Sequence, residues 1–172
     1  NGGSSGPLKP CTRRDRPPLT IRSPLARGED LRDVQHPDPG PLPVEPDKAA
    51  NDATLAGIDV NSNGIRDDVE RAIYFKYKDS AEEAAPAFQY AKALQMEFTD
   101  VYNSGTLVAV MQEEDRASVC MLDLKKGEEI ENLVFNTDMR KQAQEDLYEK
   151  YMTSYSLPNK DGCDLDPASL SN

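Results

Sequence analysis

The sequence predicts an all-α fold, a compact bundle of about four or five helices that follows a disordered, proline-rich linker. Apolar residues recur at helical spacing from residue 51 onward, and no segment shows the apolar–polar alternation of a strand. Ten of the 13 prolines lie in the first 46 residues. A chain of 172 residues has room for one domain of ordinary size and a long tail.

The N-terminal part is expected to be a linker. Proline fixes φ and donates no backbone hydrogen bond, so the prolines between Pro7 and Pro46 interrupt both helices and sheets. The run HPDPGPLPVEPD favours an extended, polyproline-like spacer. We therefore divide the chain into a disordered Pro-rich linker or tether, residues 1–47, and a helical domain, residues 48–172.

The start of the chain has two interpretations. It opens with Asn1 rather than Met, which indicates a processed or trimmed product. The segment NGGSSG is either a remnant of cloning or the flexible tether that follows the lipidated cysteine of a bacterial lipoprotein. Its Gly/Ser start and the Pro-rich spacer resemble the second arrangement. That resemblance implies a place in the bacterial cell envelope, as a periplasmic or outer-membrane lipoprotein, or secretion.

Apolar residues spaced by three and four positions form stripes that predict the helices. One helix spans 65–78, with its stripe at Val69, Ile73 and Tyr77. The next begins at 81 or 85, after the capping-box pair Ser80 and Glu83, and runs to 102. Later helices are expected over 106–124, 128–135 and about 137–157, with a break at Gly127. The stripe of the last helix is Met139, Ala143, Leu147, Tyr151 and Tyr155.

Three cysteines, Cys11, Cys120 and Cys163, allow one disulfide and one free thiol, and their spacing fits no zinc motif. Cys120 lies in a helical pattern, whereas Cys163 lies in a polar tail that little else would hold. We expect a Cys120–Cys163 disulfide, worth about 3 to 4 kcal/mol on the chain-entropy model, with Cys11 as the odd residue. Three unpaired thiols in a reducing compartment are the alternative.

One segment carries specific chemistry. Residues 59–70, DVNSNGIRDDVE, match the pattern D-x-[DN]-x-[DN]-G-x5-E of a calcium loop at every defined position. Ca²⁺ requires six to eight oxygen ligands at about 2.3 to 2.6 Å, and alternate positions of a tight loop present oxygens to one centre. Gly64 would permit the sharp turn. The expected ligands are Asp59, Asn61, Asn63, the Ile65 carbonyl, Asp67 and a bidentate Glu70.

The segment resembles the EF-hand-like calcium loops of secreted bacterial proteins, including those similar to dockerin and thrombospondin type 3 repeats. Two departures matter. The eighth position of the loop, where a branched apolar residue usually pairs with a second hand, is Arg66, and the preceding helix, 52–58, is short and contains Gly57. The resemblance implies a solitary structural site for Ca²⁺. The alternative is an Asx-rich turn that caps the following helix, with Asp67 and Asp68 at its positive end.

Charge and motifs restrict the function. The net charge of -11 lies entirely after residue 47, which argues against nucleic acid or an anionic membrane as partner. Contact with a membrane is expected only through an N-terminal lipid anchor. The acidic pairs and triplets, including Glu113, Glu114 and Asp115, are interpreted as exposed helix faces, and the single histidine, His36, lies in the linker.

We therefore expect no enzyme. The preferred class is an exported, calcium-stabilised helical protein that binds another protein through its acidic surface, as envelope inhibitors and immunity-type lipoproteins do. The alternative class is an envelope enzyme with a carboxylate-based or calcium-assisted site, for which no catalytic residue can be named.

Overall fold

The computed structural model describes residues 42–121, 124–157 and 162–170. Most of the expected linker, with Cys11 and His36, lies outside these residues. All the described residues belong to one compact unit of the chain.

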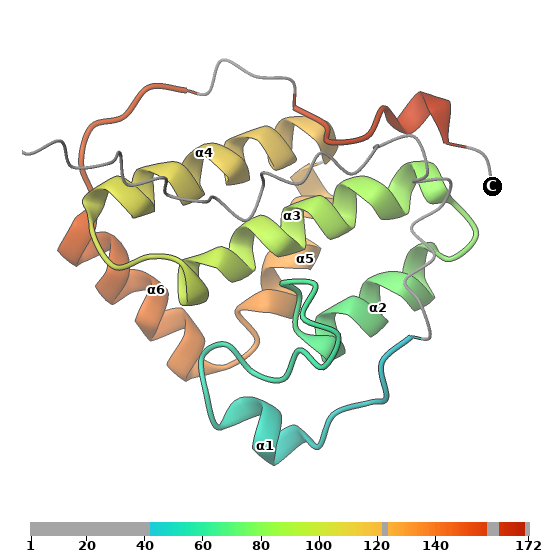
Figure 1. Ribbon diagram of the computed structural model, residues 1–172, viewed down its shortest axis with the longest axis horizontal. Coiled ribbons are helices and arrows are strands. Elements are labelled where there is room, and N and C mark those ends of the chain that lie inside the picture. The colour runs from blue at the N-terminus through green and yellow to red at the C-terminus, as the bar shows by residue number, and fades with distance from the viewer. Residues whose placement is uncertain (1–41, 122–123, 158–161, 171–172) are drawn as a thin grey trace, which may run out of the picture. The chain divides into compact units, whose positions relative to one another are not determined.

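The regular structure of the described residues is entirely helical, with six α-helices, one 3-10 turn and no strand (Figure 1). This result confirms the all-α class. The elements are α1 (Lys48–Asp52), α2 (Asp67–Tyr77), α3 (Ala81–Thr99), α4 (Ser104–Met121), α5 (Leu124–Val134), α6 (Asp138–Tyr151) and the 3-10 turn η2 (Pro167–Ser169).

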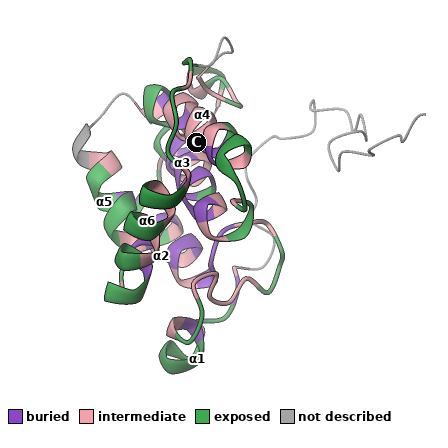
Figure 2. Cartoon of the chain, turned by 90° about the vertical axis from the view of Figure 1, so that its left-hand side faces the viewer, coloured by how far each residue is buried: buried purple, intermediate pink, exposed green. Residues whose placement is uncertain are grey.

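Helix α3 is the centre of the bundle and packs against α2, α4 and α5 (Figure 1). Buried residues line the facing sides of these helices, and exposed residues cover α1 and most of α6 (Figure 2). The stripe that the sequence predicted for α2 is buried, with Val69 and Ile73 at most 1% exposed. The core cluster comprises Ile65, Val69, Ile73, Tyr77, Ala84, Ala87, Tyr90, Ala91, Ala93, Leu94, Ala117, Ile130, Val134 and Phe135.

Side-chain caps explain several helix starts. The Ser80 side chain accepts a hydrogen bond from the Glu83 N–H, as the capping-box spacing predicted. The side chains of Asp47 and Thr137 accept from backbone N–H groups in the first turns of α1 and α6. Helix α2 lacks such a cap, but its first turn carries acidic side chains, which suit the positive end of the helix dipole.

Some expected boundaries are wrong. Gly127 ends no helix; it lies inside α5, and a Cβ there would meet Met121 and Tyr90 at an ordinary 3.8 Å. The helix before the loop spans 48–52 rather than 52–58, and α6 ends at Tyr151. The stripe of α6 is only partly buried, since Met139 is 42% exposed, and the one buried residue of that helix is Arg140.

Two irregular segments are fixed to the helices. Residues 42–47 have no regular structure, yet Pro43 is buried and its carbonyl accepts a hydrogen bond from Arg71 Nη1 at 2.7 Å. The C-terminal segment is joined to α4 by the Cys120–Cys163 disulfide, with the Cα atoms 4.8 Å apart, which agrees with the expected pairing. Among the described residues, no helix has the length and apolar character needed to span a bilayer.

Candidate functional site

The segment 59–70 forms a tight loop that leads into α2. Its backbone turns through two left-handed residues, Ser62 with φ 58° and Gly64 with φ 87°. The second is the glycine that the calcium-loop pattern requires at its turn. The Asp67 N–H donates to the Ile58 carbonyl at 2.8 Å and closes the loop at the start of α2.

Side-chain oxygens inside the loop hold its backbone. The Asp59 carboxylate accepts hydrogen bonds from the N–H groups of Asn63 at 3.2 Å and Gly64 at 2.9 Å. The Asn63 side-chain oxygen accepts from the Ile65 N–H at 2.8 Å. The Asn63 bond is an Asx turn, and together these hydrogen bonds hold the backbone of the loop in its tight turn.

The two acidic residues at the end of the loop are buried. Asp67 is 0% exposed and Glu70 is 1% exposed. The Asn61 side-chain amide donates to both Glu70 oxygens, at 3.3 and 3.1 Å. Asp67 Oδ1 accepts from the Val60 N–H at 3.1 Å, whereas the buried Oδ2 has no hydrogen-bond partner among the described residues. Burial, and next to it the charge of Asp59, raises the pKa of Asp67, and burial also raises the pKa of Glu70.

The loop fits calcium in its donor types, and only in part in its arrangement. Three carboxylates, two amides and a carbonyl are the hard oxygen ligands that Ca²⁺ prefers. Within the described residues, however, no group of three Asp, Glu, His or Cys side chains is placed to hold a metal ion. The Asn61 amide also points its N–H₂ group at Glu70, so the amide must turn over to offer its oxygen to a cation.

Arg66, the residue that departs from the EF-hand pattern, joins the loop to the bundle. It is 0% exposed, and its guanidinium donates to the carbonyls of Val134 at 3.0 Å and Leu133 at 2.8 Å. These carbonyls belong to the last residues of α5, where a cation satisfies unpaired acceptors. Arg66 Nε also pairs with Asp68 at 2.5 Å.

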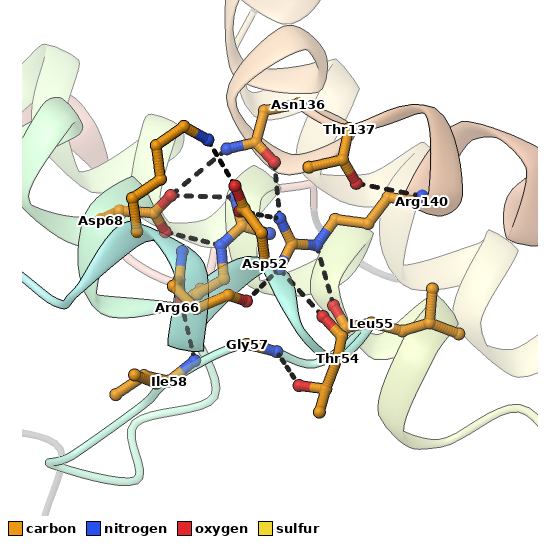
Figure 3. A network of polar contacts seen from close by, with 12 residues as sticks. Asp52, Thr54, Leu55, Gly57, Ile58, Arg66, Asp68, Asn136, Thr137 and Arg140 are labelled. Atoms are coloured by element: carbon orange, nitrogen blue, oxygen red, sulfur yellow. Dashed lines mark hydrogen bonds and ion pairs between the residues drawn. The ribbon is translucent and has the colours of Figure 1, made fainter.

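A second buried guanidinium, that of Arg140, joins α6 to the segment that precedes the loop (Figure 3). It is 0% exposed and forms an ion pair with Asp52 at 3.1 Å. Burial, and then the charge of Arg66, lowers its pKa. Its other acceptors are the Asn136 side chain and the carbonyls of Asn51, Thr54 and Leu55.

A cavity of about 270 Å³ adjoins the loop, α3 and the C-terminal segment. Gln89 holds the C-terminal wall, donating to the Gly162 carbonyl at 2.8 Å and accepting from the Asp164 N–H at 2.9 Å. The cavity is lined by Asn63, Ile65, Glu70, Ala85, Pro86, Phe88, Gln89, Lys92, Asp164 and Leu165. Three of the residues expected to bind calcium thus face a pocket.

Sequence reasoning missed a buried carboxyl pair. Glu114 was grouped with Glu113 and Asp115 as an exposed acidic face, but its Oε1 atom is buried, and it lies against Glu97 of α3, which is 1% exposed. The helical period of α4 offered a signal, since Glu114 follows the buried Leu107 and Val110 by seven and four residues.

No protein-family model, curated protein or solved structure matches this chain.

Proposed function

We propose that this chain is an exported helical protein that is stabilised by Ca²⁺ in the loop 59–70 and binds another macromolecule. The observation that supports the metal best is the unpartnered oxygen of Asp67. A carboxylate oxygen that is buried without a donor is costly, and a cation would satisfy it. Ca²⁺ would be held by the side chains of Asp59, Asn61, Asn63, Asp67 and Glu70 and by the Ile65 carbonyl.

The role of the metal would be structural. Arg66 lies within the loop and holds the end of α5, while the preceding residues hold Arg140 of α6. A cation that fixes the loop therefore fixes a point where α2, α5 and α6 meet. Its positive charge would also offset the negative charges of the Asp59, Asp67 and Glu70 carboxylates. Because Ca²⁺ would bind the folded chain and not the unfolded one, it raises stability by mass action.

The test of the metal is thermal unfolding of the full chain with millimolar Ca²⁺ and with a chelator. At free Ca²⁺ tenfold above the dissociation constant the gain is about 1.4 kcal/mol, a rise of a few degrees in Tm. Glu70→Gln removes one charge and the bidentate ligand at the same size, so most of that rise should be lost while the helical circular dichroism is kept.

The matched control is Glu82→Gln, which changes an exposed glutamate of α3 away from the loop and should keep the full rise. Titration calorimetry with Ca²⁺ measures binding directly. Equal Tm values with calcium and chelator, together with no heat of binding at millimolar Ca²⁺, would show that the loop is only a helix cap.

The proposed partner is a protein with a basic surface. The net charge of -11 supports this, because acidic surfaces attract cationic partners and repel nucleic acid. The disulfide between Cys120 and Cys163 supports an oxidising compartment such as the bacterial envelope. Enzyme inhibitors and immunity-type proteins of the envelope belong to this class by analogy only.

Retention of envelope proteins on the immobilised chain tests this part. A partner bound through charge should be released by salt and retained at least tenfold less by a variant with Glu82, Glu128 and Glu149 changed to Lys, since all three are exposed. The variant must melt like the wild type. Failure to retain any protein, or equal retention by the folded variant, contradicts the proposal.

A further inference from the structure

Glu97 of α3 is the centre of a polar cluster inside the bundle. Its side chain is buried, and its Oε1 atom accepts hydrogen bonds from Gln144 Nε2 and from the Tyr148 hydroxyl, both at 3.0 Å. Both donors belong to α6. The other oxygen, Oε2, is buried and has no hydrogen-bond partner among the described residues.

The Glu114 carboxyl of α4 lies against that of Glu97. Glu114 Oε1 is likewise buried without a hydrogen-bond partner among the described residues. Two ionised carboxylates offer acceptors only, so these two buried oxygens can satisfy each other only if a proton lies between them. Because Glu97 already receives two donors, we place the proton on Glu114. Burial and then the charge of Glu97 raise the pKa of Glu114 to about 9.

The neighbouring titratable groups strengthen this effect. The charge of Glu131 in α5 acts on Glu97, and that of Asp115 in α4 acts on Glu114. Three tyrosines, Tyr90, Tyr148 and Tyr155, lie near the pair, and burial raises the pKa of each above its usual value. These groups are neutral or negative, so they add no cation that would favour two ionised carboxylates.

Helix α6 depends on this cluster for its docking. Arg140, at its N-terminal end, is the one buried residue of the helix. The middle of the helix reaches the bundle through the hydrogen bonds of Gln144 and Tyr148 to Glu97. Little apolar burial is therefore available to hold that part of α6 if the carboxyl pair is lost.

We propose that Glu97 and Glu114 share one proton and that this bond is a pH-sensitive latch, which docks the middle of α6 on α3 and α4 and releases it when the proton leaves. The end of α6 at Arg140 stays attached, because that guanidinium remains charged in the relevant range. Release exposes the two carboxylates to water, where their repulsion is screened.

The sign of the effect follows from proton linkage. A glutamate in the released state titrates near its ordinary pKa of 4.5, whereas the docked state keeps its proton to about pH 9. The docked state therefore holds one more proton between these values. The equilibrium constant that favours the docked over the released state is therefore largest below the lower pKa. It falls about tenfold per pH unit between the two pKa values, and the contribution of the proton is lost once the pH passes the higher one.

Hydrogen exchange of the full chain, corrected for intrinsic rates, tests the latch between pH 6 and pH 9.5. Protection of the amides of residues 144–151 should fall about tenfold per pH unit up to about pH 9, while the α3 amides near Ala91 and Leu94 change less. Glu114→Gln keeps a donor to Glu97 without a titrating proton, so it should make α6 protection independent of pH. Glu145→Gln, on the exposed face of α6, should behave as the wild type.

Carboxyl carbon NMR of the wild type gives a second measurement that needs no variant. It should show one buried glutamate that is neutral at pH 7 and titrates near pH 9. Two carboxylates ionised at pH 7, an α6 whose protection does not change with pH, or α3 and α6 amides that lose protection in parallel would each overturn the latch.

Discussion

Arg66 attaches the loop 59–70 to the helices of its own bundle. In the EF-hand pattern its position carries an apolar residue that contacts a second hand. Here the guanidinium reaches the last carbonyls of α5, so the loop packs on its own bundle. Gly57 makes room for this side chain, since a Cβ there would lie 2.1 Å from Arg66 Cδ, and its φ of 69° also disfavours other residues.

Arg66→Ala is predicted to destabilise the chain by about 3 to 5 kcal/mol, because it removes the donor to the buried Val134 carbonyl and the partly buried Leu133 carbonyl and leaves Asp68 without its cation. Arg66→Lys keeps the charge but not the planar fork, so its cost should lie between that value and zero. Urea unfolding measures both.

The control for this series is Lys76→Gln, which removes an ion pair to Glu129 between two side chains that are each about half exposed. Its cost should be about 1 kcal/mol or less. A cost of Arg66→Ala as small as that of the control would mean that the guanidinium adds little to the attachment of the loop.

At the scale of the helix, α6 is attached in an unusual way. Its expected apolar stripe is only partly buried, and its firm contacts are polar: Arg140 at one end, and Gln144 and Tyr148 in the middle. Helix α3 is the opposite case, with alanines packed against three neighbouring helices. The central helices are therefore held by apolar packing, whereas α6 is held by groups whose strength depends on charge and proton binding.

This contrast explains what the sequence could predict. Apolar spacing predicted α2, α3 and α4 well. Apolar residues at helical spacing share one face of a helix, and that face packs into the core, as Val69, Ile73 and Leu107 do. The same rule failed for α6, where the buried residue is an arginine. Periodicity treats a charged residue as exposed, and only tertiary partners such as the Asn51 and Thr54 carbonyls reveal its burial.

The candidate site was predictable to a similar extent. The positions of Asp59 and Gly64 in the pattern agree with the turn that the structure shows, since a short loop with a left-handed glycine is a local property. The contacts of Arg66 with α5 and of Glu97 with Glu114 join residues far apart in the sequence. No local pattern encodes them, so single-sequence reasoning could not find them.

For the whole unit, the C-terminal segment closes one side of the bundle. The disulfide joins it to α4, Arg116 pairs with Asp164 at 2.7 Å, and Gln89 of α3 binds the backbone on both sides of Cys163. Leu165 and Asp164 then form part of the cavity beside the loop 59–70. The covalent link therefore fixes a wall of that cavity as well as the end of the chain.

Removing this link should loosen the segment and lower stability. The bonded cysteines are 43 residues apart, and closing a loop of that length is worth about 4 kcal/mol on the chain-entropy model. The variant Cys120→Ala with Cys163→Ala should therefore unfold at lower urea than the oxidised wild type, by up to that amount. Hydrogen exchange should show early loss of protection at Asp164, whose N–H bonds to Gln89, while the buried amides of α3 stay protected.

Reductant should shift the wild type toward the variant and leave the variant unchanged. Equal stability of variant and oxidised wild type would mean that the hydrogen bonds of Gln89 and the Arg116–Asp164 ion pair are sufficient to hold the segment.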